Sequence, residues 1–459
     1  MCINLPEKVD YILKKLQKQG FEAYAVGGCV RDALLGREPE DWDITTSARP
    51  EQVKEIFRRT IDTGIQHGTV TVMMEKEGFE VTTYRIDGEY DDSRHPKSVQ
   101  FTGDLIEDLK RRDFTINAMA YNKEEGLVDV FDGAKDLRNG MLRCVGSPIE
   151  RFSEDALRML RAVRFAGQLD FVIEEETKQA IIKLSSGLGK ISAERIRVEL
   201  DKLLCSRKPE HLLTASELGI TSIVLPEFDR MLATQQNHPH HQYNVGVHTL
   251  KAIEYVHEQK EELMFGKRTL SLLSWTALLH DIGKPDTRTV DEEGIDHFYL
   301  HVPKSREMAK NILKRLRWDN HTIDTVCRLV QYHDVCFSKK KGKMRHLMNG
   351  IGVEFMPYLF IIMKADILAQ SMYMREEKLQ NLQQAQRMYE EIQSAGDPVS
   401  LKMLDINGID LQEAGFPKGK LLGEILNGLL ECVMEKPELN QRETLLALAK
   451  DGWGERKEK

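Results

Sequence analysis

The chain has 459 residues, of which 41% are hydrophobic and 30% charged, and its formal net charge is −8 at pH 7. This length exceeds what one hydrophobic core fills, so we expect two or more domains, and the composition excludes disordered and membrane proteins. No apolar run is long enough for a transmembrane helix, and the N-terminal segment is typical of an amphipathic helix rather than a signal peptide. We therefore expect a cytosolic (cytoplasmic) protein without a membrane partner.

Charge and cysteine usage set two further limits. An acidic protein is a poor general RNA binder, although a local basic face can still contact phosphates. The seven cysteines include no CxxC pair, and their odd number argues against a disulfide framework, so we expect reduced thiols that serve packing.

The secondary-structure pattern changes near residue 146. Residues 21–145 carry short β-rich runs, AYAVGG, GTVTVMM and FEVTTYR, between helical stretches, which predicts a small α/β head with a mixed sheet over 1–145. Farther along, apolar residues recur every three or four positions, as in SEDALRMLRAVRFAG, which predicts a mainly helical remainder. We divide that remainder into a neck (146–235), a module that begins with the histidine-dense HPHHQYNVGVH (236–372) and a tail (373–459).

The first site signal is VGGCVRDALLG, in which an apolar strand runs into Gly27-Gly28 and a helix begins near Val30. Glycines at such a turn let backbone N–H groups at the helix start approach a triphosphate, and Arg31 could add a positive charge. The pattern predicts a phosphate cradle at Gly28 and Arg31, with an ordinary tight turn as the alternative.

Asp41 and Asp43 in PEDWDITTSARP follow this cradle. If the segment is a strand, alternation points both carboxylates to one face, where they can bridge two Mg²⁺ ions. Such ions lower the pKa of an attacking hydroxyl and neutralise charge on the leaving pyrophosphate. Glu80 in FEVTTYR could supply a third carboxylate from a neighbouring strand, and an exposed strand residue is the alternative interpretation.

GGCVRDALLG followed by DWDITTSA resembles the signature of the polymerase-β superfamily branch that contains class II tRNA nucleotidyltransferases and bacterial poly(A) polymerases. Later segments resemble the further motifs of that family in sequence and in order: RRDFTINAMA, LVDVFDGAKDLRNGMLR, RFSEDALRMLRAVRFA and SAERIRVEL. The resemblance implies a polymerase-β-like nucleotidyltransferase head in which Asp41 and Asp43 hold the catalytic magnesium ions. It also implies that Arg112 faces the triphosphate.

Asp155 and Arg158 in SEDALRMLR are three residues apart, so on one helix they would be neighbours that present an acceptor beside a donor. Cytosine and adenine offer an amine beside a ring nitrogen, whereas uracil and guanine offer a carbonyl beside an N–H group. Such a pair would select C and A without a template, at about 1–3 kcal/mol for each unmatched group. The resemblance implies the same role, because the EDxxR motif of the family pairs with the incoming base. Without the other motifs, a surface ion pair would be the simpler interpretation.

Arg161 and Arg164 continue in steps of three, and each step turns about 60° backwards round a helix, so these side chains cannot all contact one base. We expect Arg161 to face the triphosphate. The resemblance implies that Arg164 is also a nucleotide contact, and a brace between the head and the helical body is the alternative.

Three regions bear on the RNA substrate. RIDGEYDDSRHPKSVQF resembles the flexible loop that CCA-adding members have and CC-only members lack, which argues against a CC-only enzyme and leaves A-only addition open. The tail GIDLQEAGFPKGKLLGEILNGLLECVMEKPELNQRETLL resembles that of tRNA-maturing members and favours tRNA over poly(A). We expect RNA phosphates to contact the densest basic cluster, for which a solvated loop is the alternative. The cluster comprises Lys339, Lys340, Lys341, Lys343 and Arg345.

A second constellation has the order H…HD…D, each member in a helical context such as TALLHDIGK, and it resembles the HD phosphohydrolase superfamily. Its members are His248, His280, Asp281 and Asp366. Four N and O ligands suit an octahedral divalent ion, a transition metal among them, and a metal-bound hydroxide can attack a phosphoester. His301 and His333 could support a second ion. The module would be a phosphatase or cyclic phosphodiesterase acting on RNA ends, or a structural metal site.

These patterns predict template-independent addition of C, C and A to the 3′ end of tRNA from CTP and ATP by two-metal nucleotidyl transfer. An A-adding enzyme or a poly(A) polymerase would share every motif of the head. The alternative of another class is a metal-dependent HD phosphohydrolase whose head only senses nucleotide. A non-enzymatic RNA-binding role would leave two catalytic constellations idle.

Overall fold

The protein is described by a computed structural model that covers residues 3–87 and 99–453. It folds as two compact units, Met1–Asp229 and Arg230–Lys459. The boundary falls shortly before residue 236, where the sequence predicts the start of the histidine-rich module. Residues 88–98, which form much of the loop predicted from RIDGEYDDSRHPKSVQF, lie outside the described residues.

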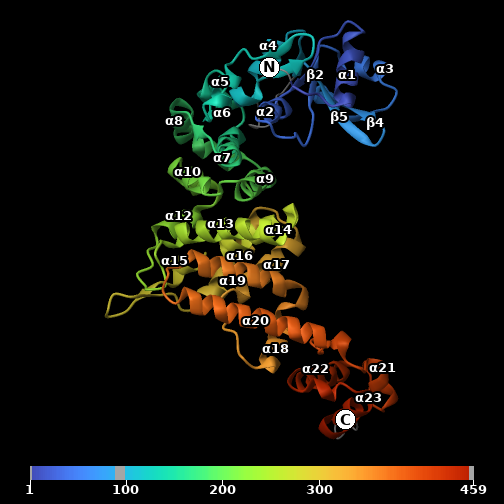
Figure 1. Cartoon of the computed structure of the whole chain (residues 1–459), viewed down its shortest axis with the longest axis vertical. Coiled ribbons are helices and arrows are strands. Elements are labelled where there is room, and N and C mark those ends of the chain that lie inside the picture. Colours follow the sequence, from blue (N-terminus) through green and yellow to red (C-terminus); the bar gives the residue numbers. More distant parts are fainter. Residues whose placement is uncertain (1–2, 88–98, 454–459) are drawn as a thin grey trace. The chain divides into compact units, whose positions relative to one another are not determined.

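A mixed sheet organises unit 1 (Figure 1). Its seven strands within the described residues have the order β3-β4-β5-β2-β1-β8-β9. Strands β2 and β5 run parallel, whereas the other neighbours are antiparallel. The strands are β1 (Ala23–Val26), β2 (Ile44–Thr46), β3 (Thr60–Gly64), β4 (Thr69–Met74), β5 (Glu77–Thr83), β8 (Ala120–Asn122) and β9 (Gly126–Val128). The predicted mixed α/β head is thereby confirmed.

Short helices cover this sheet. Helix α1 (Glu7–Gln17) repeats apolar residues at helical spacing and buries that stripe, while its acidic and basic residues stay outside. Two small ribbons accompany the head, β6 (Arg85–Asp87) with β7 (Val99–Phe101) and β10 (Met141–Leu142) with β11 (Val172–Ile173). The remaining head helices are α2 (Gly28–Leu34), α3 (Pro50–Ile56), α4 (Leu105–Lys110) and α5 (Gly133–Arg138).

The neck of unit 1 is helical, as the sequence predicts. Its central helix α7 is buried over most of its length and packs against α9 and α10. The neck helices are α6 (Pro148–Glu154), α7 (Leu157–Leu169), α8 (Glu175–Leu184), α9 (Ala193–Leu204), α10 (His211–Glu217) and α11 (Thr221–Val224). Helix α12 (Pro226–Ala233) crosses the boundary between the two units.

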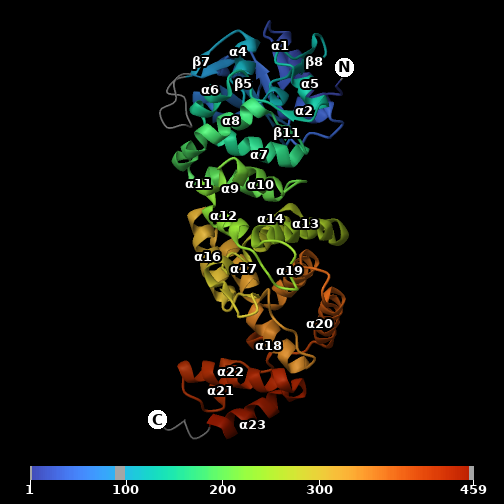
Figure 2. The same ribbon diagram turned by 90° about the vertical axis from the view of Figure 1, so that its left-hand side faces the viewer.

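Helix α19 (Met356–Ala369) of unit 2 is apolar and most of its residues are buried. Figure 2 shows it beside the other helices of the bundle. Such an all-round apolar helix belongs at the centre of a helical bundle. Helices α13, α14, α17 and α20 pack against it. The helices round it are α13 (Val245–Leu263), α14 (Lys267–Leu279), α15 (Lys284–Thr287), α16 (His301–Arg315), α17 (Asn320–Tyr332), α18 (Lys341–Ile351) and α20 (Arg375–Ala395), with a ribbon of β12 (Thr289–Val290) and β13 (Asp296–His297).

The C-terminal part of unit 2 has an apolar core of its own. This core includes Leu411, Ile425, Leu429 and Leu445. They come from α21 (Gly408–Glu413), α22 (Lys420–Glu435) and α23 (Arg442–Trp453), and α22 also packs against α18. Among residues 3–87 and 99–453, no helix is both long and apolar enough to cross a membrane.

The six described cysteines are free thiols. Cys29, Cys144 and Cys327 are buried, as packing residues should be, and Cys205 is half-buried. Cys336 and Cys432 are exposed, so the packing prediction is wrong for these two.

Candidate active site and candidate metal centre

A glycine turn joins β1 to α2. Gly27 has φ of 83°, a conformation that favours glycine, and α2 begins at Gly28. A Cβ on Gly27 would lie 2.9 Å from Nη1 of Arg112, so the missing side chain also lets that guanidinium approach the backbone. The steric demand therefore falls on Gly27 rather than on the predicted Gly28, whose Cβ would meet nothing closer than 3.6 Å.

The two predicted metal ligands lie at one end of the parallel pair β2 and β5. Asp41 and Asp43 precede β2, which begins at Ile44, so they are in the segment that enters the strand and not in the strand itself. Ile44 pairs with Val81, which places Asp43 in register with Glu80 on the neighbouring strand. The sheet thus brings the third predicted carboxylate beside the first two.

The electrostatics of this group agree with its geometry. Partial removal from water raises the pKa of Asp43; the positive charge of Arg112 lowers it and the negative charge of Asp41 raises it further. Desolvation also raises the pKa of Glu80, and the charges of Asp43 and Asp41 add to that rise. Neighbouring negative charges that raise the pKa of Asp43 and of Glu80 in this way attract a cation.

The two arginines of the predicted phosphate site have different surroundings. Arg31 is buried, and its guanidinium donates to Asn117 Oδ1 at 2.7 Å and to both carboxylate oxygens of Asp32. Arg112 has a weak ion pair with the buried Asp108 at 3.4 Å, and its Nε has no hydrogen-bond partner among the described residues. Arg112 therefore keeps donor capacity for a ligand, whereas Arg31 already has partners within the protein.

The two predicted base-selecting residues flank a helix start. The chain is extended at Asp155 (φ −137°), between α6 and α7, so the expectation that both residues share one continuous helix is wrong. Asp155 Oδ1 accepts from Leu157 N at 3.0 Å and its Oδ2 accepts from Arg195 at 2.7 Å. The guanidinium of Arg158 donates to Glu154 at 2.6 Å and to the carbonyl of Arg111 at 2.9 Å. Asp155 and Arg158 are therefore each held in place by other residues.

Arg161 and Arg164 belong to a buried ionic network. Arg161 donates twice to Asp113 Oδ2, at 2.6 and 2.9 Å. Arg164 donates to Glu199 at 2.5 Å and stacks on the ring of Phe165 at 3.6 Å. Burial lowers the pKa of Arg164 to about 10, although Glu199 opposes this. The Arg161 contact links α7 to the segment before η2 (Thr115–Asn117) in the head, whereas the contacts of Arg164 link α7 to α9 within the neck, so a brace between head and body at Arg164 stays a prediction.

Gly27, Asp113 and Arg195 are among the residues of this site that are absent from the sequence-based prediction. All lie within segments that carry the family resemblance, VGGCVRDALLG, RRDFTINAMA and SAERIRVEL. Each could have been found from its position in the sequence: Gly27 adjoins the predicted Gly28, Asp113 adjoins the predicted Arg112, and Arg195 lies within the motif SAERIRVEL.

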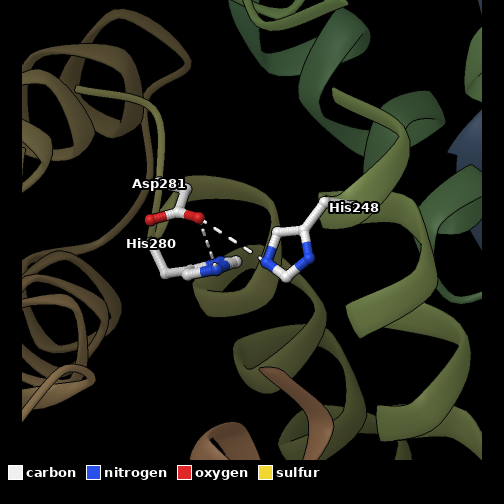
Figure 3. Close-up of side chains that lie close together, drawn as sticks. All are labelled: His248, His280 and Asp281. Carbon is white, nitrogen blue, oxygen red and sulfur yellow. Dashed lines mark ion pairs between the residues drawn. The ribbon is translucent and has the colours of Figure 1, made fainter. Parts of the chain in front are cut away.

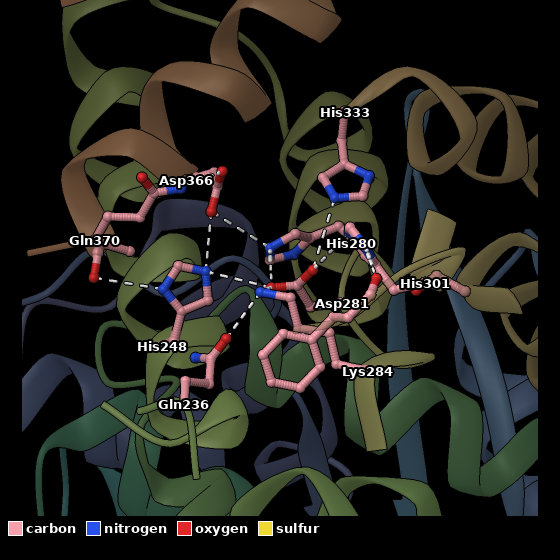
Figure 4. Close-up of polar contacts among 12 residues, drawn as sticks. Gln236, His248, His280, Asp281, Lys284, His301, His333, Asp366 and Gln370 are labelled. Carbon is pink, nitrogen blue, oxygen red and sulfur yellow. Dashed lines mark hydrogen bonds and ion pairs between the residues drawn. The ribbon is translucent and has the colours of Figure 1, made fainter. Parts of the chain in front are cut away.

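The second constellation converges inside unit 2. His248, His280 and Asp281 form one group whose ligand atoms lie within 4.8 Å of one another (Figure 3). Asp281, His301 and His333 form another. Asp281 belongs to both. Its Oδ2 lies 3.3 Å from His280 Nε2 and its Oδ1 lies 3.6 Å from His301 Nε2. Asp366 joins the first group, with its Oδ1 2.9 Å from His248 Nε2 (Figure 4).

All four histidines present their Nε2 atoms inward for the same reason. In each ring Nδ1 faces a backbone carbonyl oxygen at 2.7–3.4 Å, which favours the tautomer whose lone pair is on Nε2. The Nε2 atoms of His248 and His280 are buried and face carboxylate oxygens of Asp281 and Asp366 at 2.9–3.6 Å. Buried imidazole nitrogens aimed at shared carboxylates are the arrangement that a divalent metal requires.

Electrostatics at this centre favour positive charge. Burial acts to lower the pKa of His280, but Asp281 and Asp366 outweigh it and raise that pKa to about 10. Burial acts to raise the pKa values of Asp281 and Asp366. Contacts with His280 and Lys284 hold the pKa of Asp281, and hydrogen bonds with His248 and His280 hold that of Asp366, well below the usual range. Lys284, also buried, lies 2.7 Å from Asp281 Oδ2 and 2.8 Å from Gln236 Oε1. The centre opens into a cavity of about 510 Å³.

The predicted basic cluster is only partly available to RNA. Lys341 pairs with Glu391 at 2.8 Å. Arg345 is buried and donates to Asp397 and to the carbonyl of Met434, so the prediction that it contacts RNA is wrong: its donors have partners within the protein. Lys339 and Lys340 are exposed before α18.

Comparison with known proteins assigns the head and the helical parts to one kind of enzyme. Residues 23–143 match the Poly A polymerase head domain, residues 170–232 match the "Probable RNA and SrmB-binding site of polymerase A" and residues 288–449 match tRNA nucleotidyltransferase domain 2. The structure of the Bacillus stearothermophilus CCA-adding enzyme in complex with CTP superimposes with a TM-score of 0.71 at 27% identity, over 97% of each chain.

Relatives of full length agree. The CCA-adding enzyme of Ligilactobacillus salivarius is 38% identical over 460 residues, 97% of each protein. That of Lactiplantibacillus plantarum is 36% identical over 441 residues, 96% of this chain and 94% of the relative. With this identity over the whole length, and with the head fold and its carboxylates described above, the chain belongs to the CCA-adding enzymes, tRNA nucleotidyltransferases of the polymerase-β superfamily.

Proposed function

We propose that this chain adds C, C and A to the 3′ end of tRNA, using CTP and ATP and releasing pyrophosphate. The observation that carries the proposal is the register of β2 and β5, which aligns Asp43 with Glu80 next to Asp41. The full-length CCA-adding relatives favour this activity over addition of A alone or poly(A) synthesis.

Asp41 and Asp43 would hold the divalent metal that nucleotidyltransferases of this fold use. Carboxylate oxygens suit Mg²⁺, and the raised pKa of Asp43 beside the negative charge of Asp41 fits a site that receives a cation. When bound, such a metal makes the 3′-hydroxyl a better nucleophile and neutralises the leaving pyrophosphate. Glu80 would accept the hydroxyl proton. Arg112, whose Nη1 lies beside Gly27 and whose Nε has no hydrogen-bond partner in the described part of the chain, would bind the triphosphate. Gly28 and Arg31 would shape that cradle from α2.

Asp155 and Arg158 would choose the base. The Asp155 carboxylate accepts a hydrogen bond from the exocyclic amine of C or A, and the Arg158 guanidinium donates to the adjacent ring nitrogen. Arg195 and Glu154 orient these two groups through the contacts given above. Arg161 and Arg164 act indirectly, by fixing α7 against Asp113 and Glu199. RNA phosphates would meet Lys339, Lys340 and Lys343 in the helical body.

A second activity is favoured by the centre in unit 2. We infer that His248, His280, Asp281 and Asp366 hold a divalent ion, with His301 and His333 completing a second position through Asp281. The buried Nε2 atoms of His248 and His280, which face the carboxylates of Asp366 and Asp281, support this inference. A bound metal would supply a hydroxide for phosphoester hydrolysis, as in an HD-type phosphohydrolase. We also propose the four-part division 1–145, 146–235, 236–372 and 373–459 as the functional organisation.

The principal test offers the purified chain three tRNAs, ending before CCA, after C and after CC, with labelled CTP and ATP. We expect CMP followed by AMP on the first two, AMP alone on the third, and no further addition once the CCA end is complete. Failure to incorporate CTP would leave only A addition or poly(A) synthesis, and unlimited AMP addition would identify the latter.

A further inference from the structure

A groove of about 380 Å³ lies along α16 and α17 in unit 2, and it belongs to neither site described above. Most of its lining is polar or charged. The residues that line it are Arg306, Lys310, Asp324, Cys327, Arg328, Gln331, Tyr332 and Gly350. Three cations and one acid therefore face a single hollow in a chain whose formal net charge is −8. A local positive surface on an otherwise acidic protein attracts an anionic ligand to that surface.

The cations differ in how firmly they are placed. Arg328 is anchored, because its Nη1 donates to the carbonyl of Ile351 at 2.9 Å and its guanidinium lies 5.2 Å from the ring of Phe355. Arg306 and Lys310 are exposed, and neither forms an ion pair with another described residue. They are therefore free to meet a ligand without first losing a partner within the protein.

The row of cations continues along α16 to Lys314. Burial raises the pKa of the Cys327 thiol and the charge of Asp324 adds to this rise, whereas the charges of Arg306, Lys310 and Lys314 lower it, so all three cations lie near the same strip of α17. Residues four apart lie on one face of a helix, and a rise of about 1.5 Å per residue separates them by about 6 Å along the axis. The strip is therefore a line of positive charges and not a point.

This geometry selects between two kinds of anion. A small anion competes with water and is held by several buried donors that converge on it. Here the two unpaired cations are exposed and follow one another along a helix, which suits successive phosphates of a polynucleotide strand. Phosphate contacts of this kind fix the position of a nucleic acid without reading its sequence.

We propose that the α16–α17 groove binds consecutive phosphates of the tRNA backbone through Arg306, Lys310 and Arg328, with Lys314 extending the row. The inference rests on the proposed function, because it takes tRNA as the polynucleotide. It names a contact surface separate from the cluster at Lys339–Lys343.

The test measures tRNA binding by the full chain over a salt series. The variants are Lys310→Ala and Arg306→Ala/Lys310→Ala, and the matched control is Lys304→Ala. Lys304 is on the same helix, but it faces another side and pairs with Asp286 and Glu307. Each lost phosphate contact lowers the slope of log K against log salt by roughly 1 and weakens binding by roughly tenfold. We expect this loss for tRNAs with any 3′ end, with an unchanged KM for CTP at saturating tRNA and an unchanged Tm.

Several results would overturn the proposal. An unchanged slope in the double variant, or an equal loss in Lys304→Ala, would exclude the groove. If inorganic phosphate bound in the groove, but the double variant kept the wild-type slope of log K against log salt for tRNA, the groove would be a site for small anions instead. The charge-conserving variant Arg306→Lys/Lys310→Arg should retain the slope of the wild type. If the wild type binds tRNA through the groove but adds no nucleotide, only the proposed function fails. If the wild type adds CCA and the double variant keeps the wild-type salt slope, only the proposal about the groove fails.

Discussion

The guanidinium of Arg195 lies 2.7 Å from Oδ2 of Asp155, across 40 residues of sequence. The other oxygen of that carboxylate caps the start of α7 through Leu157 N. Both oxygens are therefore oriented, one by a charge on α9 and the other by the backbone of α7. A carboxylate fixed in this way can discriminate between bases. An amine of the base donates a hydrogen bond to it, whereas a carbonyl at the same position cannot and leaves it without that bond.

Replacing Arg195 should blur that discrimination. In Arg195→Met we expect the preference for CTP over UTP to fall roughly tenfold, because a charge-assisted hydrogen bond contributes about 1.5 kcal/mol or more. Incorporation of each nucleotide on a tRNA that ends before CCA measures the effect. The control is Lys202→Met, which removes one positive charge from an exposed position on the same helix, α9. Unaltered selectivity in Arg195→Met would remove Arg195 from the base-selecting group.

Asp113 should be the most costly acid to neutralise in the head. It is buried and accepts from Arg161, from Asn117 and from the backbone of Phe114. Asp113→Asn leaves Arg161 without its partner, and we expect a loss of roughly 3–5 kcal/mol in the free energy of unfolding at pH 7. Urea denaturation measures it. The exposed Asp170→Asn should change little, because asparagine tolerates the left-handed conformation at that position.

The same aspartate predicts a pH dependence of stability. Burial acts to raise the pKa of Asp113, but the charge and hydrogen bonds of Arg161 outweigh it and hold that pKa well below the usual range. A depressed pKa stabilises the folded state fully above the unfolded pKa of about 3.9, and this stabilisation is lost as the pH falls below that value. The difference between wild type and Asp113→Asn should therefore shrink below about pH 4. A constant difference down to low pH would contradict the assignment.

Acid should inactivate nucleotide addition earlier than ordinary carboxylates would. The pKa values of Asp43 and Glu80 are both raised, so these groups take up protons at a higher pH than free side chains do. Protonated carboxyls bind metal poorly, so the acid limb of kcat should move to lower pH as the Mg²⁺ concentration rises. Glu80→Gln should lower kcat by about 10²-fold or more if Glu80 accepts the proton. Glu77→Gln on the same strand is the control, and equal rates in the two variants would remove Glu80 from the chemistry.

Metal binding in unit 2 should depend on Asp281 above all, because it belongs to both ligand groups. We expect wild type to bind two Mn²⁺ or Ni²⁺ ions, His301→Gln to bind one and Asp281→Asn to bind none. Metal at about 100 times its Kd should stabilise the wild type by about 2.7 kcal/mol. Metal analysis after dialysis and thermal unfolding measure both quantities. His297→Gln, at the rim with Asp291 as partner, should bind metal normally; full occupancy in Asp281→Asn would contradict the centre.

Local patterns predicted much of this molecule. The strands AYAV, TVTVMM and EGFEVTT appear where their β-rich sequence places them, and the amphipathic N-terminal segment forms α1. The order of motifs also indicated the family. Periodicity and turn residues are local properties, so the sequence carries them directly.

Long-range pairing could not be predicted in the same way. The alignment of Asp43 with Glu80 depends on which strands pair, and the basic run around Lys341 does not reveal that Arg345 reaches the carbonyl of Met434. The break at Asp155 arises because its carboxylate caps the next helix, which competes with a continuous helix through SEDALR. Such choices depend on tertiary partners.

The double variant Asp41→Ala/Asp43→Ala gives the most direct test of the central claim. Offered tRNA that ends before CCA with CTP, ATP and Mg²⁺, it should add no nucleotide while it still binds tRNA and unfolds at the Tm of the wild type. CMP and AMP incorporation at the rate of the wild type would contradict the assignment of these two carboxylates to the catalytic metal site.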